Sequence, residues 1–249
     1  MEIDPLSVQF PRSGYGLYFR QLYRRYGWKA WVKQFRFAHR RPFSRGLIQK
    51  HAPRGFGIEV GVGFFSIAPI QRTVLTDGFA AHGADGSIAT HFCKAHRIPS
   101  RDGVFAFVLS EHVLEHIANP VAALVEWHRV LKPGGKIFLF LPHPRRTFDR
   151  ARERTSLQHL LQDDHDQVPE ADSTHLAEWK SKVIDAGLAP HYQSIPIEDH
   201  PRLGIIHHHV WMPEDIVELL ETLGWRVIES LDQCPDRGDT FVVVAEKVK

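Results

Sequence analysis

The stretch "GVFAFVLSEHVLEHIANPVAALVEWHRVLKPGGKIFLFLP", residues 103–142, contains the pattern that decides the fold. It begins and ends with apolar runs that are typical of buried strands. Between these runs, residues 119–135 have the spacing of an amphipathic helix. Asn119 is the expected N-cap, Pro120 occupies the first helical position, and Gly134 follows the last turn. The order strand, helix, strand predicts parallel strands joined by a crossover helix.

The same alternation continues on both sides of this stretch. Further strands are expected at 56–60, 73–78, 89–95, 225–230 and 240–247, and a further helix at 212–224. Residues 145–209 interrupt the alternation, because they are charged, rich in histidine and contain helical pieces. We expect them to form an inserted helical lid on an α/β body whose sheet is mostly parallel.

The composition excludes several classes of protein. With 249 residues, of which 43% are hydrophobic and 24% charged, the chain is expected to be globular. No apolar run approaches the roughly 20 residues that cross a bilayer, and residues 1–16 lack the basic start and apolar core of a secretory signal. Cys93 and Cys234 match no metal-ligand spacing and are expected to be free thiols, which favours a cytoplasmic location.

The N-terminal 50 residues form a basic, aromatic-rich arm. They contain eleven Lys or Arg and two acidic residues, a net charge of +9, whereas the rest of the chain carries −7. Residues 14–37 have roughly helical apolar spacing, with Gly27 as the expected break. Two interpretations are open. The aromatics pack on the body while the basic groups stay in water, or residues 12–50 contact an anionic membrane surface or a phosphate-bearing substrate.

The segment "GIEVGVGFF", residues 57–65, has the glycine spacing of a loop that lies against a nucleotide-like ligand. Gly61 and Gly63 would let the backbone approach the ligand, because a Cβ would block it. Glu59 precedes them, and Asp77 ends the next expected strand, eighteen residues later. An acid at each of these strand ends is typical of a site that binds a ribose and an adenosine, although a tight turn alone would have the same glycines.

Residues 93–142 resemble the class I S-adenosylmethionine-dependent methyltransferases. The motifs that carry the resemblance are "LEH" at 114–116, "NP" at 119–120 and "RVLKPGG" at 129–135. The resemblance extends over residues 55–145 and weakly to the C-terminus. It implies a Rossmann-like sheet, mostly parallel, that ends in an antiparallel C-terminal hairpin.

The resemblance also implies a division of the chain. A methyltransferase domain would span residues 51–249, with the insertion at about 145–209, and would follow the basic helical extension at 1–50. Residues 142–163 and 207–220 are similar to a subgroup found among bacterial surface-polysaccharide enzymes. These segments therefore favour a sugar or glycan as the substrate.

Several residues acquire expected roles from the family pattern. S-adenosyl-L-methionine would be the cofactor, with its methionine part above Glu59, Gly61 and Gly63. Asp77 would accept hydrogen bonds from the ribose hydroxyls. Ser110 and Glu111 would lie at the tip of the fourth strand, near the sulfonium and the substrate.

The chain departs from the family pattern at three positions. Phe65 stands where a small residue is usual, Lys94 where an acid binds the adenine amino group, and Ala106 where an acid is frequent. Pro69 and the short connection to the next strand predict that residues 64–72 turn outward instead of forming a long helix. These departures leave open a degenerate domain that binds ligands or partners without catalysis.

Histidine is the natural general base for methyl transfer to a hydroxyl group. By analogy with the family, His112 and His143 lie near the cofactor and are the candidate bases, together with Glu111. His116 belongs to the "LEH" motif and is either structural or catalytic. Adjacent residues on a strand point to opposite faces, so we expect no metal site from the three histidines at 207–209.

The function that we expect from the sequence is methyl transfer to an oxygen of a sugar or a lipid-linked glycan. The alternatives are a non-catalytic scaffold domain in a polysaccharide pathway and an RNA methyltransferase. Nucleic acid is the less favoured partner, because no RNA-binding motif accompanies the Arg and aromatic residues of the arm. The expected partners are a small-molecule or glycan acceptor and the cytoplasmic face of an anionic membrane, contacted through residues 12–50.

Overall fold

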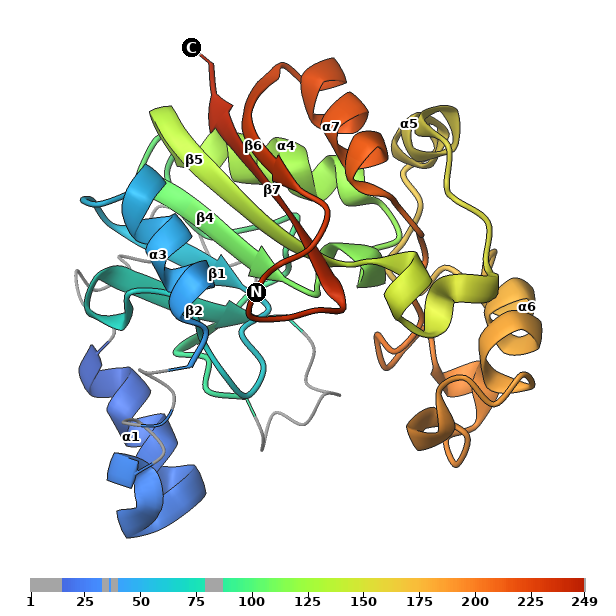
Figure 1. Ribbon diagram of the computed structural model, residues 1–249, viewed down its shortest axis with the longest axis horizontal. Helices are drawn as coiled ribbons and strands as arrows, with labels where there is room; N and C mark the ends of the chain where they lie inside the picture. Colours follow the sequence, from blue (N-terminus) through green and yellow to red (C-terminus); the bar gives the residue numbers. More distant parts are fainter. Residues whose placement is uncertain (1–14, 33–35, 37–39, 79–86, 249) are drawn as a thin grey trace, which may run out of the picture.

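The computed structural model describes residues 15–32, 36, 40–78 and 87–248 (Figure 1). Its centre is a seven-stranded sheet in the order β3-β2-β1-β4-β5-β7-β6. The strands are β1 (Gly57–Val60), β2 (Thr73–Asp77), β3 (His91–Phe92), β4 (Phe105–Glu111), β5 (Leu131–Pro142), β6 (Trp225–Leu231) and β7 (Thr240–Lys247). The first five strands in this order pair in parallel, and β7 is antiparallel to both β5 and β6. This sheet confirms the predicted Rossmann-like fold with a C-terminal antiparallel hairpin.

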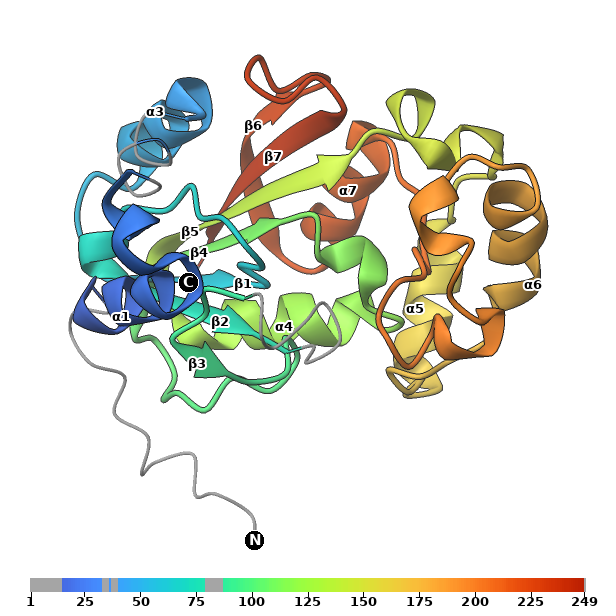
Figure 2. The ribbon, with the colours of Figure 1, turned by 90° about the horizontal axis from the view of Figure 1, so that it is seen from below.

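Helices cover both faces of the sheet (Figure 2). The longer helices are α1 (Tyr15–Tyr26), α3 (Pro42–His51), α4 (Pro120–Val130), α5 (Leu157–His165) and α7 (Pro213–Thr222), and α6 (Leu176–Trp179) is a single turn. A hydrophobic core lies on each face of the sheet, and alternate residues of β5 pack into one core or the other. Ile137 and Leu139 pack with residues of α4 and α7, whereas Phe138 and Phe140 pack with residues of α3. In the part of the chain that the structure describes, no helix is both long enough and apolar enough to cross a bilayer.

The helix predicted at 119–135 is shorter than expected. Asn119 is the N-cap, and its Oδ1 accepts a hydrogen bond 2.9 Å long from the Ala122 backbone N–H, but the helix ends at Val130. Residues 131–135 instead begin β5, where the register with β4 shifts between Phe105 and Phe107. The chain bulges at this point, and Gly134 adopts a left-handed φ of 72°. Pairing with β4 therefore ends the helix before the glycines.

The arm packs one face of α1 on the body and exposes another. Tyr18 and Leu22 are buried in a cluster with Val62 and Leu75 of the sheet domain. Helix α1 ends at Tyr26, and the predicted break at Gly27 is present as a left-handed residue with φ 56°. The packing interpretation is thus supported for one face of this helix. Residues 1–14, 33–35 and 37–39 of the predicted arm lie outside the described residues.

Residues 145–209 lie beyond the carboxyl ends of the parallel strands (Figure 1). Besides α5 and α6 they contain a π-helical turn at Lys180–Ile184 and several short 3-10 turns. A small core of their own includes Trp179, Val183 and Ile206. The insertion is helical, as predicted, and its position places it next to the site described below.

Candidate functional site

A cavity of about 370 Å³ opens at the carboxyl ends of β1, β2 and β4. Ligands of open parallel sheets bind at this edge, and the volume lies within the range of about 300–1,000 Å³ found for small-molecule sites. Glu59, Gly61, Gly63, Asp77 and Glu111 are among its lining residues. With His112, which also lines it, the cavity gathers six of the eight predicted site residues around one space.

The two acids on the β1–β2 side are buried and held by hydrogen bonds. Glu59 accepts a hydrogen bond from Ser66 Oγ, and burial raises the pKa of Glu59 to about 8. Asp77 Oδ2 accepts hydrogen bonds from the Gly63 backbone N–H at 3.2 Å and from Ser87 Oγ at 2.8 Å. These bonds hold the Asp77 carboxylate beside the glycine loop.

Gly61 and Gly63 of the loop are glycines for different structural reasons. Both have left-handed φ angles, 71° at Gly61 and 52° at Gly63. A Cβ on Gly61 would lie 2.3 Å from a Val113 methyl group, whereas a Cβ on Gly63 would meet no described atom within 4 Å. The missing side chain of Gly61 makes room for Val113, and Gly61 also lines the cavity, so its predicted cofactor contact stays a prediction. Gly63 also lines the cavity, and the space around its missing Cβ is open.

The link between β1 and β2 contains no α-helix. After Gly63 the chain runs irregularly and forms only a short 3-10 turn at Ile70–Arg72 before β2 begins. Phe65 lines the cavity and packs partly against the core on the α3 side of the sheet. The predicted outward turn of residues 64–72 is consistent with this course, and the cavity gains no helix N-terminus from this link.

Glu111 lies between two arginines that the sequence did not single out. Its carboxylate forms ion pairs with Arg41 and, at 2.8 Å, with Arg237. Arg41 also bonds Asp236 at 2.8 Å. The arginines lie 70 and 126 residues from Glu111 in the chain, so no local pattern could reveal the network. An acid that is paired twice in this way is well suited to position neighbouring groups and poorly suited to act as a base.

The predicted bases occupy different places. His112 lines the cavity, but its Nε2 lies 2.7 Å from Thr240 Oγ1 and its Nδ1 lies 3.2 Å from an Arg237 nitrogen. Burial and the nearby Arg237 charge hold the pKa of His112 well below its ordinary value. His143 is not among the described residues that line the cavity, and its Nε2 bonds Asp232 at 3.0 Å. The position of His143 therefore gives no support to its predicted role.

Ser110 is buried at the end of β4 and is likewise outside the described lining of the cavity. Its Oγ has no hydrogen-bond partner among the residues that the structure describes. The strand carries it to the cavity edge, but its side chain contributes no surface there. The predicted cofactor contact of Ser110 thus has no counterpart in the cavity lining.

The structure adds Glu115 and His116 to the site. Both carboxylate oxygens of Glu115 are buried without a hydrogen-bond partner in the described chain, and burial raises the pKa of Glu115 to about 7. One of these oxygens lies 3.9 Å from His112 Nδ1 and 3.9 Å from His116 Nε2. His116 lines the cavity, and its Nδ1 lies 3.0 Å from the Ile206 carbonyl oxygen of the insertion. The spacing "EHVLEH" was the available signal for this cluster.

The insertion also supplies an acid beside Lys94. A smaller cavity of about 30 Å³ shares Asp77 and His116 with the first and is lined in addition by Lys94 and Glu170. The Lys94 ammonium lies 2.8 Å from a Glu170 oxygen. Position 94 lacks the usual acid, but Glu170, from another segment of the chain, places an acid beside it. Ala106, in contrast, packs against Gly55 and lines neither of these two cavities.

Residues 72–139 match the family model of the methyltransferase domain. This part of the chain has the sequence pattern of a methyltransferase domain. An uncharacterized protein of Methanocaldococcus jannaschii is 34% identical over 96 residues, which cover 37% of this chain and 47% of that protein. The chain therefore spans about half the length of this relative.

Two solved methyltransferases share the fold. The 1,6-didemethyltoxoflavin-N1-methyltransferase of Burkholderia thailandensis, solved with S-adenosylhomocysteine, is 11% identical, with a TM-score of 0.50 over 97% of this chain and 94% of its own. The CurJ carbon methyltransferase is 16% identical, with a TM-score of 0.50 over 100% of this chain and 62% of its own. At these identities the neighbours establish the fold of the methyltransferase domain.

The family implies S-adenosylmethionine as the cofactor of this domain. The cavity fits such a ligand in three respects. Its volume is sufficient, Gly63 leaves open space beside the loop, and the Asp77 carboxylate is held at the second strand end, where it suits ribose hydroxyls. The residues present therefore match the chemistry of the implied group.

Proposed function

We propose that this domain transfers a methyl group from S-adenosylmethionine to a hydroxyl oxygen of a sugar or a lipid-linked glycan. The observation that carries the proposal is the shared cavity, which Glu59, Gly63 and Asp77 line on one side and His112 and His116 on the other. When bound, the cofactor supplies an electrophilic methyl group. The chain itself must bind both reactants, orient them and accept the proton of the hydroxyl group.

His116 is the residue that we propose as the general base. Its Nδ1–H donates to the Ile206 carbonyl, and this hydrogen bond selects the neutral tautomer in which Nε2 is the basic nitrogen. Glu115, 3.9 Å from that nitrogen, would stabilise the imidazolium that forms when the proton arrives. His112 instead positions neighbouring groups, because Thr240 and Arg237 engage its two ring nitrogens.

On the adenine side, Glu170 is the acid that we propose to replace the one missing at position 94. Its carboxylate is held by Lys94 and lies within 3.5 Å of His96. A carboxylate can accept a hydrogen bond from an amino group, which a lysine cannot. The small volume of this second cavity means that the exposed Lys94 side chain must shift for an adenine ring to enter.

The exposed face of the arm supports a lipid-linked acceptor. Trp28 is 72% and Trp31 64% exposed, and the ammonium of Lys29 lies 5.8 Å from the centre of the Trp28 ring. Tryptophan beside basic side chains suits the interface of an anionic membrane. We therefore propose that this face holds the domain at the membrane surface from which the glycan extends.

The experiment that tests the proposed function uses S-adenosylmethionine with a labelled methyl group. The protein is incubated with lipid-linked oligosaccharides in anionic vesicles and, separately, with the free sugars. The expected product is a methyl ether, which resists mild alkali, and His116→Asn should abolish its formation while cofactor affinity is retained. Label found in an alkali-labile ester or in RNA would reject a hydroxyl acceptor on a glycan.

A further inference from the structure

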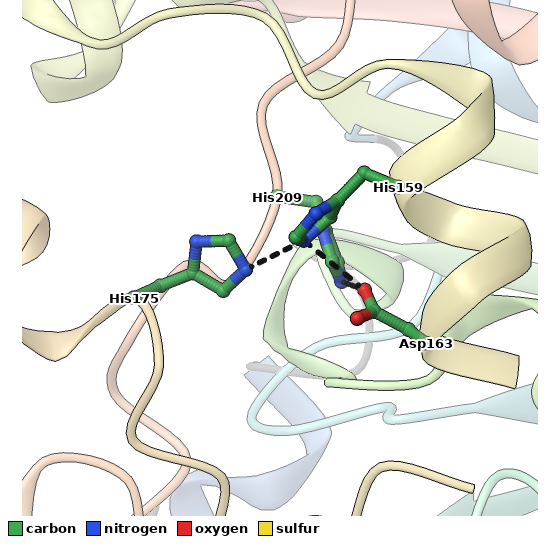
Figure 3. Close-up of side chains that lie close together, drawn as sticks. All are labelled: His159, Asp163, His175 and His209. Atoms are coloured by element: carbon green, nitrogen blue, oxygen red, sulfur yellow. Dashed lines mark hydrogen bonds and ion pairs between the residues drawn. The ribbon is translucent and has the colours of Figure 1, made fainter. Parts of the chain in front are cut away.

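Four side chains that commonly bind metals lie together outside the cavity, where the insertion meets the sheet domain (Figure 3). His159 and Asp163 are four residues apart on α5, and side chains at this spacing share one helix face. His175 precedes α6, and His209 belongs to the segment that leads to α7. One potential ligand atom of each residue lies within 4.8 Å of the other three.

The distances among these atoms fit a small tetrahedral ion. His159 Nε2 lies 3.0 Å from His175 Nε2 and 3.3 Å from Asp163 Oδ2. His209 Nε2 lies 3.8 Å from the same Asp163 oxygen. Ligand atoms placed about 2.0–2.1 Å from a tetrahedral zinc ion are about 3.3 Å apart. The three separations lie on both sides of this value, so small side-chain movements would complete the tetrahedron.

The cluster leaves polar atoms unsatisfied without a cation. Asp163 Oδ2 is buried and accepts no hydrogen bond from the described residues, although it faces two imidazoles. The side chain of His209 is fully buried, and its Nδ1 also has no partner within the described chain. Buried polar atoms are normally paired, and a metal ion bound by the carboxylate oxygen and the imidazole nitrogens would satisfy this one.

We propose that His159, Asp163, His175 and His209 form a structural zinc site. Three imidazole nitrogens and one carboxylate oxygen suit Zn²⁺, whereas Mg²⁺ and Ca²⁺ require mainly oxygen ligands. Four protein ligands close the coordination shell, as in structural rather than catalytic zinc sites. This proposal concerns the insertion and does not rest on the proposed methyl transfer.

Binding would change the hydrogen bond of one ligand. His209 Nε2 lies 3.0 Å from the Ala118 carbonyl oxygen, so in the metal-free chain this nitrogen carries the ring proton. In the zinc-bound form the proton resides on Nδ1, and Nε2 turns from Ala118 to the ion. The other two histidines already direct Nε2 at the cluster centre, as Figure 3 shows for His159 and His175.

The site would tie α5 and His175 to the end of the insertion that contacts the cavity. It joins α5 to the segment around His209, three residues after Ile206, whose carbonyl oxygen accepts the His116 hydrogen bond. The residue just before His209, His208, donates its backbone N–H to the Glu115 carbonyl at 2.7 Å. A zinc ion would thus hold the segment that positions His116 and Glu115. Ion removal should loosen the insertion before it unfolds the sheet.

The test measures zinc directly in the full-length chain. Metal analysis of the purified protein should find about one zinc per chain. The chelated protein should rebind Zn²⁺ saturably, and Co²⁺ should give the visible absorption of a tetrahedral complex. His175→Gln and Asp163→Asn should each weaken zinc binding by about tenfold or more. The matched control is His165→Gln, which alters an exposed histidine of the same helix.

One result would support the zinc site and two would overturn it. Retention of zinc by His165→Gln and its loss from the two ligand variants, with the circular dichroism spectrum unchanged, supports the site. If the chelated wild-type chain binds neither Zn²⁺ nor Co²⁺ saturably at micromolar concentration, the proposal is overturned, whatever the variants do. Equal zinc affinity in all three variants would overturn it as well, because the ion would then bind elsewhere.

Discussion

Replacement of Asp77 tests the cofactor side of the cavity most directly. Asp77 is 5% exposed, and its carboxylate is held by the Gly63 N–H and the Ser87 hydroxyl. A charge-assisted hydrogen bond contributes about 1.5–3 kcal/mol, and two bonds to a ribose diol are not fully additive. We therefore expect Asp77→Ala to weaken S-adenosylmethionine binding by about 2–4 kcal/mol. This corresponds to an increase in Kd of about 30- to 700-fold.

Two further variants separate ligand binding from loop support. Asp77→Asn keeps an acceptor oxygen for the Gly63 N–H and loses the charge, so its Kd should rise by about tenfold. Ser87→Ala removes only the hydroxyl that supports the carboxylate and should have the smallest effect of the three. Calorimetry with S-adenosylmethionine and S-adenosylhomocysteine gives each Kd. An unchanged Kd in Asp77→Ala would refute the assignment of this strand end to the ribose. Undetectable binding by the wild type at millimolar concentration would remove the proposed enzyme altogether.

Three other predictions concern stability and the arm. Gly61→Ala should lower the free energy of unfolding by about 1–2 kcal/mol or more, because φ at this position is left-handed and the new Cβ would meet Val113. A urea denaturation curve that matches that of the wild type would contradict this prediction. Burial raises the pKa of Glu59 from its ordinary value of 4.5 to about 8 in the folded chain, so stability should fall as pH rises through this window. Glu59→Gln should flatten that part of the unfolding profile, and an identical slope would exclude Glu59 as its source. Sedimentation with anionic vesicles should decrease with salt and in Trp28→Ser, whereas equal binding to neutral vesicles would argue against a charged membrane contact.

The main elements of the fold could be predicted from the sequence because their signals are local. Asn119 and Pro120 mark a helix start within a few residues, and the apolar runs of β4 and β5 are continuous because both faces of these strands are buried. The absence of a long helix after Gly63 also followed from short-range information, namely Pro69 and the number of residues available. The helix end was misplaced for the opposite reason, because pairing with β4 recruits residues 131–135 into β5.

The sequence alone determined which residues lie at the carboxyl ends of β1, β2 and β4, because strand ends and glycine turns depend on residues that are consecutive in the chain. Only the tertiary structure decided what faces those ends. Glu111 meets Arg41 and Arg237, Lys94 meets Glu170, and His209 joins the α5 residues His159 and Asp163. Three adjacent histidines cannot all bind one ion, yet His209 lies beside potential ligands that are 34 to 50 residues away in the chain. Side chains so distant in sequence meet because the sheet and the packed insertion fix their backbones, and neither spacing nor periodicity carries that information.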